Sequence, residues 1–500
     1  MDLTVLNLAV PALSADLEPT SAQLLWIVDV YGFVAAGLLV TMGTLGDRIG
    51  RRRLLLGAAA AFGAASVIAA FSASPEMLIA ARALLGAAGA ALAPSTLSLI
   101  RNMFLDPGQR TVAIGVWVSS FSAGAAVGPL VGGVMLEFFW WGSVFLVAVP
   151  VMALLLALGP VLLPEFRDPA AGRLDLVSAA MSLGAVLPVV YGLKGIAQDG
   201  LGWPPALSIA AGLAFGAAFL RRQRASAHPM IDVRLFAESA FGASLAANTL
   251  VFFVNFGTLL FFSQYLQLVV GLSPLAAGLW TVPQFVAFIA GSMLTTRVVR
   301  RVRPAFAMAG GLLVAALGFG MLARVDGASG LAAAIAASVV YSFGLAPLTT
   351  LATDLMVGAA PPERAGAASA ISETSSEFGG ALGIAVLGSI ATAVYRERVA
   401  GALPGGVPPE AAEAARDTLG GAVAAAGGLP GPLGAELLEA SRGAFMQALQ
   451  VAASTGAAIA LIIAILVLLL LRGARTGAEA AEQPRLQLEG TDPALTLEKP

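Results

Sequence analysis

Two glutamates four residues apart are the acids in this sequence with the best spacing for proton exchange. Glu373 and Glu377 occur in ISETSSEFGG, and a spacing of four places both side chains on one face of a helix. Two neighbouring carboxylates in a poorly hydrated site each make the other easier to protonate. The pair can therefore load a proton, bind a cation, or alternate between the two. The alternative is a hydrated pair near the mouth of a span.

A third acid is surrounded by aromatic residues. Asp29 lies in LLWIVDVYGF, with Trp26 and Tyr31 close by. A carboxylate beside aromatic rings suits an organic cation, through charge pairing and cation–π attraction, so we expect these residues in a substrate cavity. Arg82, in IAARALLGAAG, is expected at a similar depth. The alternative to a cation site is therefore a structural ion pair between Asp29 and Arg82.

Two further aspartates allow a functional or a structural interpretation. Asp2, in MDLTVLNLAVP, is expected near the middle of the first span, where it serves coupling, cation binding or helix packing. Asp47, in GTLGDRIGRRR, is expected at a tight turn, where it caps the next helix and pairs with Arg101. Together with Arg48, Arg51 and Arg52 it would form a conformational latch. The alternative is a simple turn acid.

The elements that position these charges must lie in a membrane. Of the 500 residues, 58% are hydrophobic and 12% are charged, about half the charged fraction of a soluble domain, which is about 25%. A charge at the centre of a span costs about 2.5–3.5 kcal/mol on insertion scales, so each buried acid needs a reason. The chain has no cysteine and one histidine, His228, which excludes disulfides, thiol nucleophiles and Cys/His metal sites. We expect no metal.

Apolar runs long enough to cross about 30 Å of hydrocarbon predict an all-α integral membrane protein. They occur at 22–46, 52–72, 77–100, 111–137, 141–163, 175–197, 203–220, 239–270, 274–296, 304–323, 329–357, 366–395 and 443–471, and a shorter run covers Met1 to Leu17. Counting this run, fourteen spans return both termini to one side. If that side is cytoplasmic, most of the 28 lysines and arginines lie inside, as the positive-inside rule requires.

A faint internal repeat indicates two six-helix halves with an inserted helix pair. A single shift places Arg48, Arg51 and Arg52 on Arg297, Arg300 and Arg301. We therefore expect an N-terminal half at 1–163, an inserted pair at 164–237 and a C-terminal half at 238–472. That last half includes a long outside loop at 396–441, with a short surface helix near 408–426. The tail 473–500 is expected to be a disordered cytoplasmic segment.

The stretch GAAVGPLVGG has small residues at helical spacing around a proline, which permits close helix packing and a bend. Its small and bending residues are Gly124, Gly128, Pro129, Gly132 and Gly133. Glycine-rich packing of this kind is common in membrane bundles, so the stretch alone indicates little about function.

Several of these motifs resemble those of the major facilitator superfamily. GTLGDRIGRRR resembles its signature loop between helices 2 and 3, and IAARALLGAAGAALAP resembles its helix 4 motif, with Leu85 where many members have glutamine. AGAAVGPLVGG resembles the antiporter motif of helix 5. DLTVLNLAVP, LEPTSAQLLWIVDVYGF, MIDVRLF at 230–236 and LSP…AG at 272–278 resemble the fourteen-helix drug:proton antiporters, especially QacA-type exporters of quaternary ammonium compounds.

Two departures from this family qualify the resemblance. Its members normally carry further residues before the helix 1 motif, so we expect either an upstream start or a shortened first span. Some relatives carry an acid in helix 10, whereas LWTVPQFVAFIAGSML here has none. Monovalent cations are therefore the better expectation than divalent ones.

The resemblance implies a multidrug efflux transporter that exchanges lipophilic cations for protons by alternating access. It also implies a role in proton coupling for Arg82, acidic roles in coupling and binding for Asp2, Asp29, Glu373 and Glu377, and a conformational latch at Asp47. It implies no cofactor other than the proton gradient, and contact with membrane lipids but not nucleic acid. We expect a monomer in a bacterial cytoplasmic membrane. An exporter of an endogenous metabolite or self-made antibiotic is the main alternative, and a passive channel is another. An ATP-driven pump is not expected, because the two lysines, Lys194 and Lys499, lie outside any phosphate-binding loop.

Overall fold

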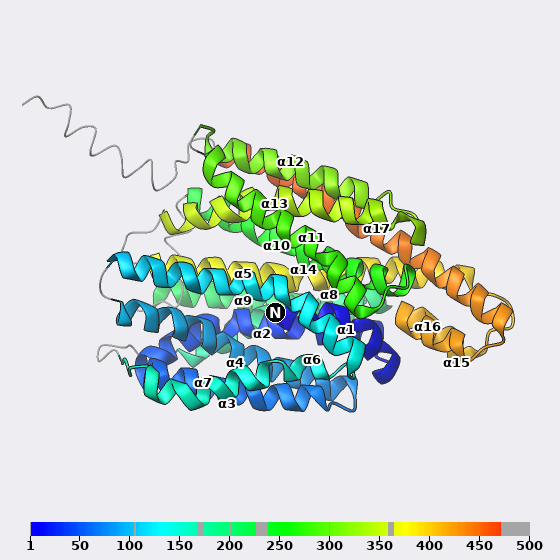
Figure 1. Cartoon of the computed structure of the whole chain (residues 1–500), viewed down its shortest axis with the longest axis horizontal. Coiled ribbons are helices and arrows are strands. Elements are labelled where there is room, and N and C mark those ends of the chain that lie inside the picture. Colours follow the sequence, from blue (N-terminus) through cyan, green and yellow to red (C-terminus); the bar gives the residue numbers. More distant parts are fainter. Residues whose placement is uncertain are drawn as a thin grey trace, which may run out of the picture.

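The computed structural model is a bundle of long, nearly parallel helices (Figure 1). It describes residues 2–104, 107–167, 175–199, 202–226, 239–299, 301–358 and 365–471. Within these ranges the chain forms helices and turns and no β-strand. A helix satisfies its own backbone hydrogen bonds, which is what hydrocarbon surroundings require. The prediction of an all-α protein is confirmed.

The helices before residue 167 pack into one group, drawn in blue and cyan in Figure 1. Thr20 caps α2 in a capping box with Gln23, and Ser74 caps α4. The run predicted at 141–163 is two helices, and Pro150, which has no N–H for the preceding turn, lies just after the break. The elements are α1 (Asp2–Leu17), α2 (Ser21–Ile49), α3 (Arg51–Ala70), α4 (Pro75–Met103), α5 (Pro107–Phe138), α6 (Ser143–Leu146) and α7 (Ala148–Leu162).

The helices after residue 239 form a second group, drawn in green, yellow and red. Small residues bring their backbones together: a Cβ on Gly318 would lie 2.3 Å from the backbone nitrogen of Tyr341. Beside this contact the rings of Phe319 and Tyr341 stack at 4.6 Å. The elements are α10 (Ser239–Gln264) with its π-helical end η2 (Tyr265–Val269), α11 (Pro274–Val298), α12 (Pro304–Leu322), the 3₁₀ turn η3 (Ala328–Gly330), α13 (Leu331–Gly358), α14 (Ala365–Ala402) and α17 (Gly431–Leu470).

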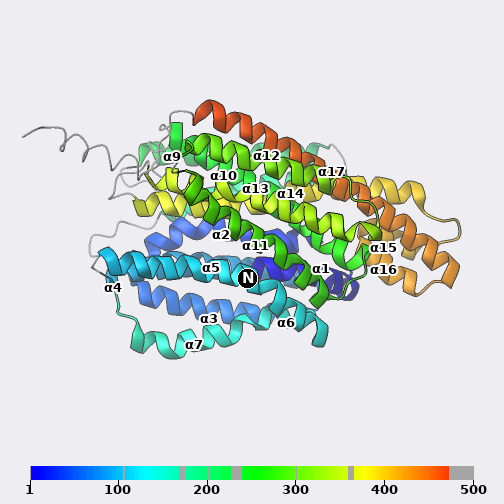
Figure 2. The ribbon, with the colours of Figure 1, turned by 45° about the horizontal axis from the view of Figure 1, so that its top comes forward.

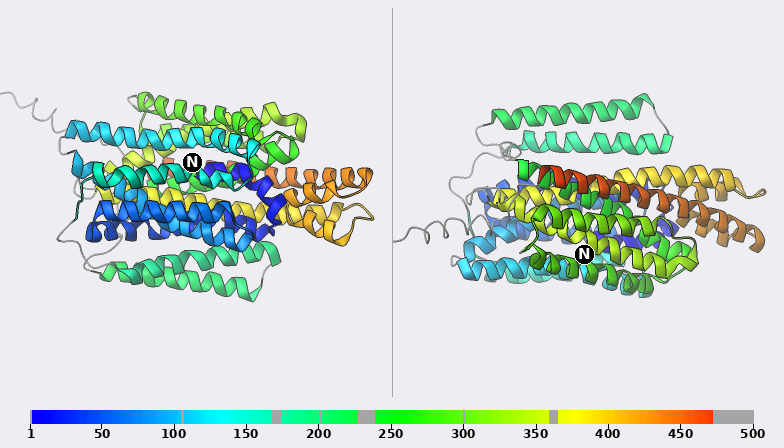
Figure 3. Two further views of the ribbon diagram at one scale, coloured as in Figure 1. Left: turned by 60° about the horizontal axis from the view of Figure 1, so that its bottom comes forward. Right: turned by 90° about the horizontal axis from the view of Figure 1, so that it is seen from above.

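The two helices that lie between these groups in the sequence form a separate layer, which we call the α8–α9 pair. It consists of α8 (Leu176–Asp199) and α9 (Trp203–Ala225), and both views of Figure 3 show it on one side of the bundle. The two helices pack against each other, while α8 also contacts α2 and α14. Much of the α9 surface is exposed, as expected of a helix that faces lipid.

The two ends of the bundle differ in charge and in covering. One end, which we call the arginine-rich end, is where α2, α9 and α11 end and where α3 and α12 begin. Its arginines are Arg48, Arg52, Arg222, Arg297 and Arg303. At the other end two short helices, α15 (Pro409–Asp417) and α16 (Leu419–Gly427), form what we call the α15–α16 cap. The sequence predicted one short helix here, near 408–426.

The α15–α16 cap is fixed to both helix groups. The Ser21 hydroxyl at the start of α2 donates to the Asp417 carbonyl, and the Tyr395 hydroxyl in α14 donates to the Ala415 carbonyl at 2.7 Å. Burial raises the pKa of the Asp417 carboxyl, and Arg396 partly opposes this shift. The cap therefore closes one end of the bundle over the boundary between the two groups.

The glycine-rich stretch of α5 joins the two groups near the capped end. A Cβ on Gly132 would lie 2.6 Å from Val5 of α1, and one on Gly133 would lie 2.8 Å from the Cα of Leu275 in α11. Across the same contact, a Cβ on Gly278 would lie 2.4 Å from the Pro129 carbonyl oxygen. Figure 2 shows α5 and α11 side by side. The small residues thus permit close contact between the groups.

By length and composition, eleven described helices are apolar enough to cross a membrane. Shorter apolar stretches occur at Val5–Leu17, Val127–Phe138 and Val177–Leu193, within α1, α5 and α8. The protein is therefore a multi-pass membrane protein, while the count of fourteen spans stays a prediction. His228, the MIDVRLF segment and the tail 473–500 lie outside the described residues.

Candidate functional site

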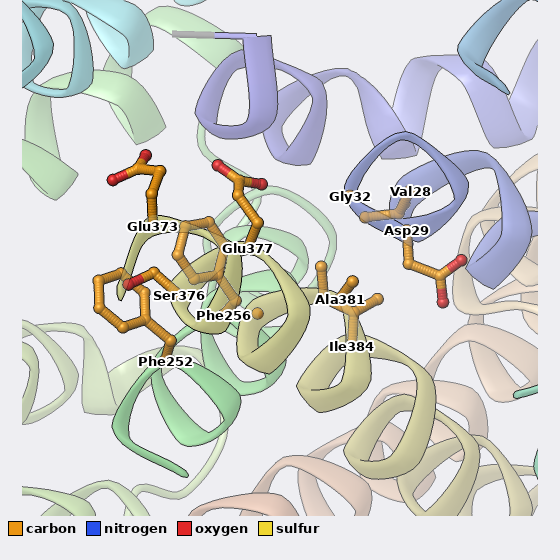
Figure 4. A pocket seen from close by; sticks show the side chains of 11 residues that line it. Val28, Asp29, Gly32, Phe252, Phe256, Glu373, Ser376, Glu377, Ala381 and Ile384 are labelled. Carbon is orange, nitrogen blue, oxygen red and sulfur yellow. The ribbon is translucent and has the colours of Figure 1, made fainter. Parts of the chain in front are cut away.

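A pocket lies where α2, α10 and α14 meet, at the boundary between the two helix groups (Figure 4). Its free volume is about 120 Å³, which is smaller than the roughly 300–1,000 Å³ of sites that enclose drug-sized molecules. Its lining combines apolar and acidic side chains. They are Val28, Asp29 and Gly32 from α2, Phe252 and Phe256 from α10, and Glu373, Ser376, Glu377, Gly380, Ala381 and Ile384 from α14.

The glutamate pair lies on the pocket face of α14. Figure 4 shows the Glu373 and Glu377 side chains extending to the same side of the helix, as their spacing predicts. Both are partly buried. The structure thus places these two predicted residues together in the pocket.

Glycines hold α14 close to α10. A Cβ on Gly379 would lie 2.3 Å from the Thr249 carbonyl oxygen, and one on Gly383 would lie 1.9 Å from that of Phe253. Because neither distance is possible for a real Cβ, these two positions require glycine at this spacing. The close approach brings the acids of α14 next to the aromatic side chains of α10.

A polar network fixes the side of α14 beside the glutamates. Asn248 of α10 donates from Nδ2 to the hydroxyls of Ser375 at 3.0 Å and Ser376 at 2.9 Å. Both hydroxyls donate in turn to the Ser372 carbonyl. The two hydrogen bonds from Asn248 therefore tie α10 to α14 beside the pocket.

Two phenylalanines supply the aromatic wall. The Phe252 and Phe256 rings stack with centroids 6.1 Å apart and an interplanar angle of 20°, and both rings line the pocket. An aromatic face attracts a cation, and the glutamates can neutralise its charge. The arrangement can therefore hold an organic cation or, with the acids protonated, stay neutral and empty.

Asp29 contributes to the lining from α2, although its carboxyl group points away from the two glutamates in Figure 4. Only 1% of the residue is exposed. Arg82, which is fully buried, donates to the carbonyls of Ile27 at 3.1 Å and Val28 at 3.3 Å, next to Asp29 in the chain. Arg82 thus binds the backbone that carries Asp29. An Asp29–Arg82 ion pair stays a prediction.

The two aromatic residues predicted for the substrate cavity do not line this pocket. The Tyr31 ring lies under the Arg82 guanidinium at 4.9 Å, against Gly89 of α4. Trp26 is partly buried and packs against a cluster that contains Phe33 and Val190. Helical periodicity explains the difference, since residues 28, 29 and 32 share the pocket face of α2 and residue 31 faces α4.

The signature loop at the arginine-rich end makes contacts that the sequence did not predict. Gly50 breaks α2 from α3 with φ 111°, in the left-handed region that favours glycine. Glu165, just after α7, accepts from the backbone nitrogen of Arg52 at 3.2 Å and lies 3.7 Å from its Nε. Arg52 also donates to the Pro160 and Leu163 carbonyls.

The remaining latch residues are placed only in part. Arg51 is buried and Arg48 is exposed. Asp47 lies in the last turn of α2 and Arg101 near the end of α4, but their side chains, like that of Asp2 in α1, are outside the described set. A latch between Asp47 and Arg101 stays a prediction. Of the antiporter-motif residues, Pro129, Gly132 and Gly133 lie at the α1 and α11 contacts, Gly128 is buried, and a Cβ on Gly124 would meet nothing within 4 Å.

Four residues that shape the pocket or the signature loop were not predicted: Phe252, Phe256, Asn248 and Glu165. The first three recur every fourth residue in α10, so they share one face. A polar residue inside an apolar span, such as Asn248, is a usable signal. Glu165 follows Pro164 directly after an apolar run, and only the fold shows that this segment returns to Arg52.

An all-helical membrane protein with a carboxylate-lined pocket between two helix groups has the form of a transporter rather than an enzyme. The chain matches the family model of the Major Facilitator Superfamily over residues 1–384, and it belongs to that family. The resemblance and the predicted fold class are thereby confirmed.

Similar proteins include a drug efflux pump and a resistance protein. The chain is 46% identical over 445 residues to the multidrug efflux pump LfrA of Mycolicibacterium smegmatis, covering 89% of this chain and 88% of LfrA. It is 36% identical to the methyl viologen resistance protein SmvA of Salmonella typhimurium, covering 93% and 94%. Among solved structures, an inward-facing bacterial homologue of the lysosomal transporter Spinster superposes with a TM-score of 0.61 at 17% identity, covering 93% and 94%.

Proposed function

We propose that this protein is a proton-coupled exporter of lipophilic organic cations, including quaternary ammonium compounds. The observation that carries the proposal is the pocket itself, which places Glu373 and Glu377 beside the stacked rings of Phe252 and Phe256. The relative named for multidrug efflux supports drug export, and the relative named for resistance to methyl viologen, a doubly charged quaternary pyridinium, supports an organic cation as the substrate.

The exchange follows from the cost of burying charge. A carboxylate in a membrane-embedded pocket is costly unless a cation neutralises it, and either a proton or an organic cation serves. Protonation therefore displaces the cation, and loss of the proton restores the site. With Glu373 and Glu377 both in the pocket, two protons, or one monovalent cation and one proton, leave no uncompensated charge on the pair, so either loaded state can cross between the two open conformations of the transporter.

Orientation gives this cycle its direction. By the positive-inside rule the arginine-rich end faces the cytoplasm. In a bacterial cytoplasmic membrane the α15–α16 cap then lies on the outer side and both termini lie on the cytoplasmic side. Protons entering from outside then drive the cation outward. The membrane potential contributes about 2.3 kcal/mol per charge for each 100 mV, so more than one proton per monovalent cation makes the exchange electrogenic. We propose that the protein acts as a monomer.

A second candidate function has its own support. The chain is 33% identical over 393 residues to the tetracenomycin C resistance and export protein of Streptomyces glaucescens. An exporter of a self-made antibiotic would use the same fold with a different preference for the bound molecule. Failure of a panel of cationic dyes to bind, with binding of neutral or anionic polycyclic compounds instead, favours this candidate.

Equilibrium binding tests the proposal directly. Purified protein should bind tetraphenylphosphonium more weakly as the pH falls, because protons compete for the same carboxylates. In a Glu377→Gln variant the affinity should fall and its pH dependence should shrink. Ser454→Ala serves as control, since Ser454 is an exposed residue of α17 that donates to its own helix. If the affinity for tetraphenylphosphonium does not depend on pH and is the same in the parent and in Glu377→Gln, the proposal is rejected.

A further inference from the structure

The α8–α9 pair covers the seam between α2 and α14. Val190 of α8 is buried with Phe33 of α2 and with Ala381 and Ala385 of α14 in one apolar cluster. Val186 and Leu187 of α8, together with Phe378 of α14, pack against the same cluster. One helix of the pair thus contacts both helix groups at once.

This seam is also a wall of the pocket. Gly32 and Ala381 line the pocket, and a Cβ on Gly32 would lie 3.0 Å from the Ala381 Cβ. Phe33, next to Gly32 in the chain, and Phe378, next to Glu377, meet edge to face across the seam, with ring centroids 6.4 Å apart. A single layer of side chains therefore separates the pocket from α8.

Further helices of the bundle lie behind α2 and α10, on the sides that face away from the pocket. Behind α2 lies α4, where a Cβ on Gly86 would be 2.5 Å from the Tyr31 carbonyl oxygen, and behind α10 lie α13 and α17. Behind α8 lies α9, with Leu207 and Leu213 more than 60% exposed. At the seam between α2 and α14, α8 and α9 therefore separate the pocket from the bilayer.

The pair is held together by polar and close contacts of its own. The Arg222 Nη2 is 2.9 Å from the Asp175 Oδ1, and Gln223 donates to Ser178 at 2.8 Å. A hydrogen bond from Ser182 to the Gly37 carbonyl at 3.0 Å ties α8 to α2. Toward α14 the cluster contacts are apolar. Apolar contacts are non-directional, so α8 can move over α14 while the pair stays intact.

We propose that the seam between α2 and α14 is a lateral entrance through which molecules dissolved in the bilayer reach the pocket, and that the α8–α9 pair is the lid over it. The partner of this surface is the hydrocarbon phase, and the molecules admitted are those that partition into it. The inference rests on the proposed function, because export of lipophilic cations is the activity that such an entrance serves.

The test uses the absence of cysteine from the chain. A Ser376→Cys variant carries one thiol on the pocket wall, and its labelling rate is measured in vesicles with two reagents. Pyrenylmaleimide dissolves in the bilayer, and a trimethylammonium methanethiosulfonate stays in water. Into this background we place Val190→Ala, which thins the lid at the seam. The matched control is Val189→Ala, because Val189 packs toward Gly212 of α9.

We expect Val190→Ala to raise the pyrenylmaleimide rate about fivefold, the factor that corresponds to about 1 kcal/mol of lost apolar packing. The rate with the charged reagent should not change, and Val189→Ala should alter neither rate. Equal increases with both reagents, equal effects of both substitutions, or no increase would overturn the proposal. The readout needs no transport, so selective labelling in a protein that exports no cation keeps the entrance and rejects only the exporter.

Discussion

Replacing Gly383 by alanine should separate the two helices that build the pocket. The new Cβ would lie 1.9 Å from the Phe253 carbonyl oxygen, about 1.5 Å short of the 3.4 Å where ordinary contact begins. The obstacle is backbone, so a side-chain rotation cannot relieve it and α14 must move from α10. Overpacking costs about 1–3 kcal/mol, and the better helix propensity of alanine returns up to about 1 kcal/mol.

The displacement should matter more for transport than for folding. Misplacing a functional group by about 1 Å can cost on the order of a hundredfold in rate, and here Phe252 and Glu377 on facing helices would part by about 1.5 Å. We expect the initial rate of cation transport in proteoliposomes to fall at least about tenfold, and thermal stability in detergent to fall modestly.

Gly310→Ala is the matched control for this experiment. Gly310 is also a helical glycine, in α12, and a Cβ there would meet nothing within 4 Å. Its stability and transport should equal those of the parent protein or exceed them slightly. If Gly383→Ala transports and unfolds like Gly310→Ala, the close contact between α10 and α14 does not set the pocket geometry, and our reasoning is refuted.

Three further outcomes are expected. Arg82→Gln removes hydrogen bonds from a guanidinium to two α2 carbonyls, worth about 1.5–3 kcal/mol each, so the melting temperature should drop; an unchanged melting temperature contradicts this. Glu165→Gln should slow transport without reducing membrane abundance, because it weakens the Arg52 contact; parental rates would dismiss that contact. A hydrogen bond from Arg222 lowers the pKa of Asp175 from 3.8 to about 2. The stability difference between the parent and Asp175→Asn should therefore be constant above pH 5, fall as the pH drops through about 2, and disappear below it; a difference that persists below pH 2 counts against the pair.

The sequence predicted the helices well because lipid restricts the alternatives. Long apolar runs bounded by Gly, Pro and Arg can only be helices in hydrocarbon, and the span expected at 22–46 is observed as Ser21–Ile49. The start of α17 was missed by twelve residues, since Gly431–Leu470 begins before the apolar run at 443–471. Its first turns pack on the α15–α16 cap, a tertiary contact that hydropathy does not register.

The site could be predicted where one helix carries it and not where several helices meet. The glutamates four apart needed only helical periodicity, and the structure places both in the pocket. Tyr31 was expected beside Asp29 because the two are close in sequence. Its ring instead packs against Arg82 and Gly89 of α4. The aromatic wall at Phe252 and Phe256 depends on which face of α10 meets α14, and that is set by Gly379 and Gly383.

Proton movement during cation transport tests the central claim most directly. Purified protein is reconstituted in liposomes that contain a pH-sensitive dye, and a lipophilic cation such as ethidium is added. Proton flux should depend on the added cation and should be lost in Glu373→Gln, while Gly310→Ala keeps it. Cation transport with no accompanying proton flux, or equal flux in Glu373→Gln, would contradict the claim that the pocket carboxylates exchange protons for the transported cation.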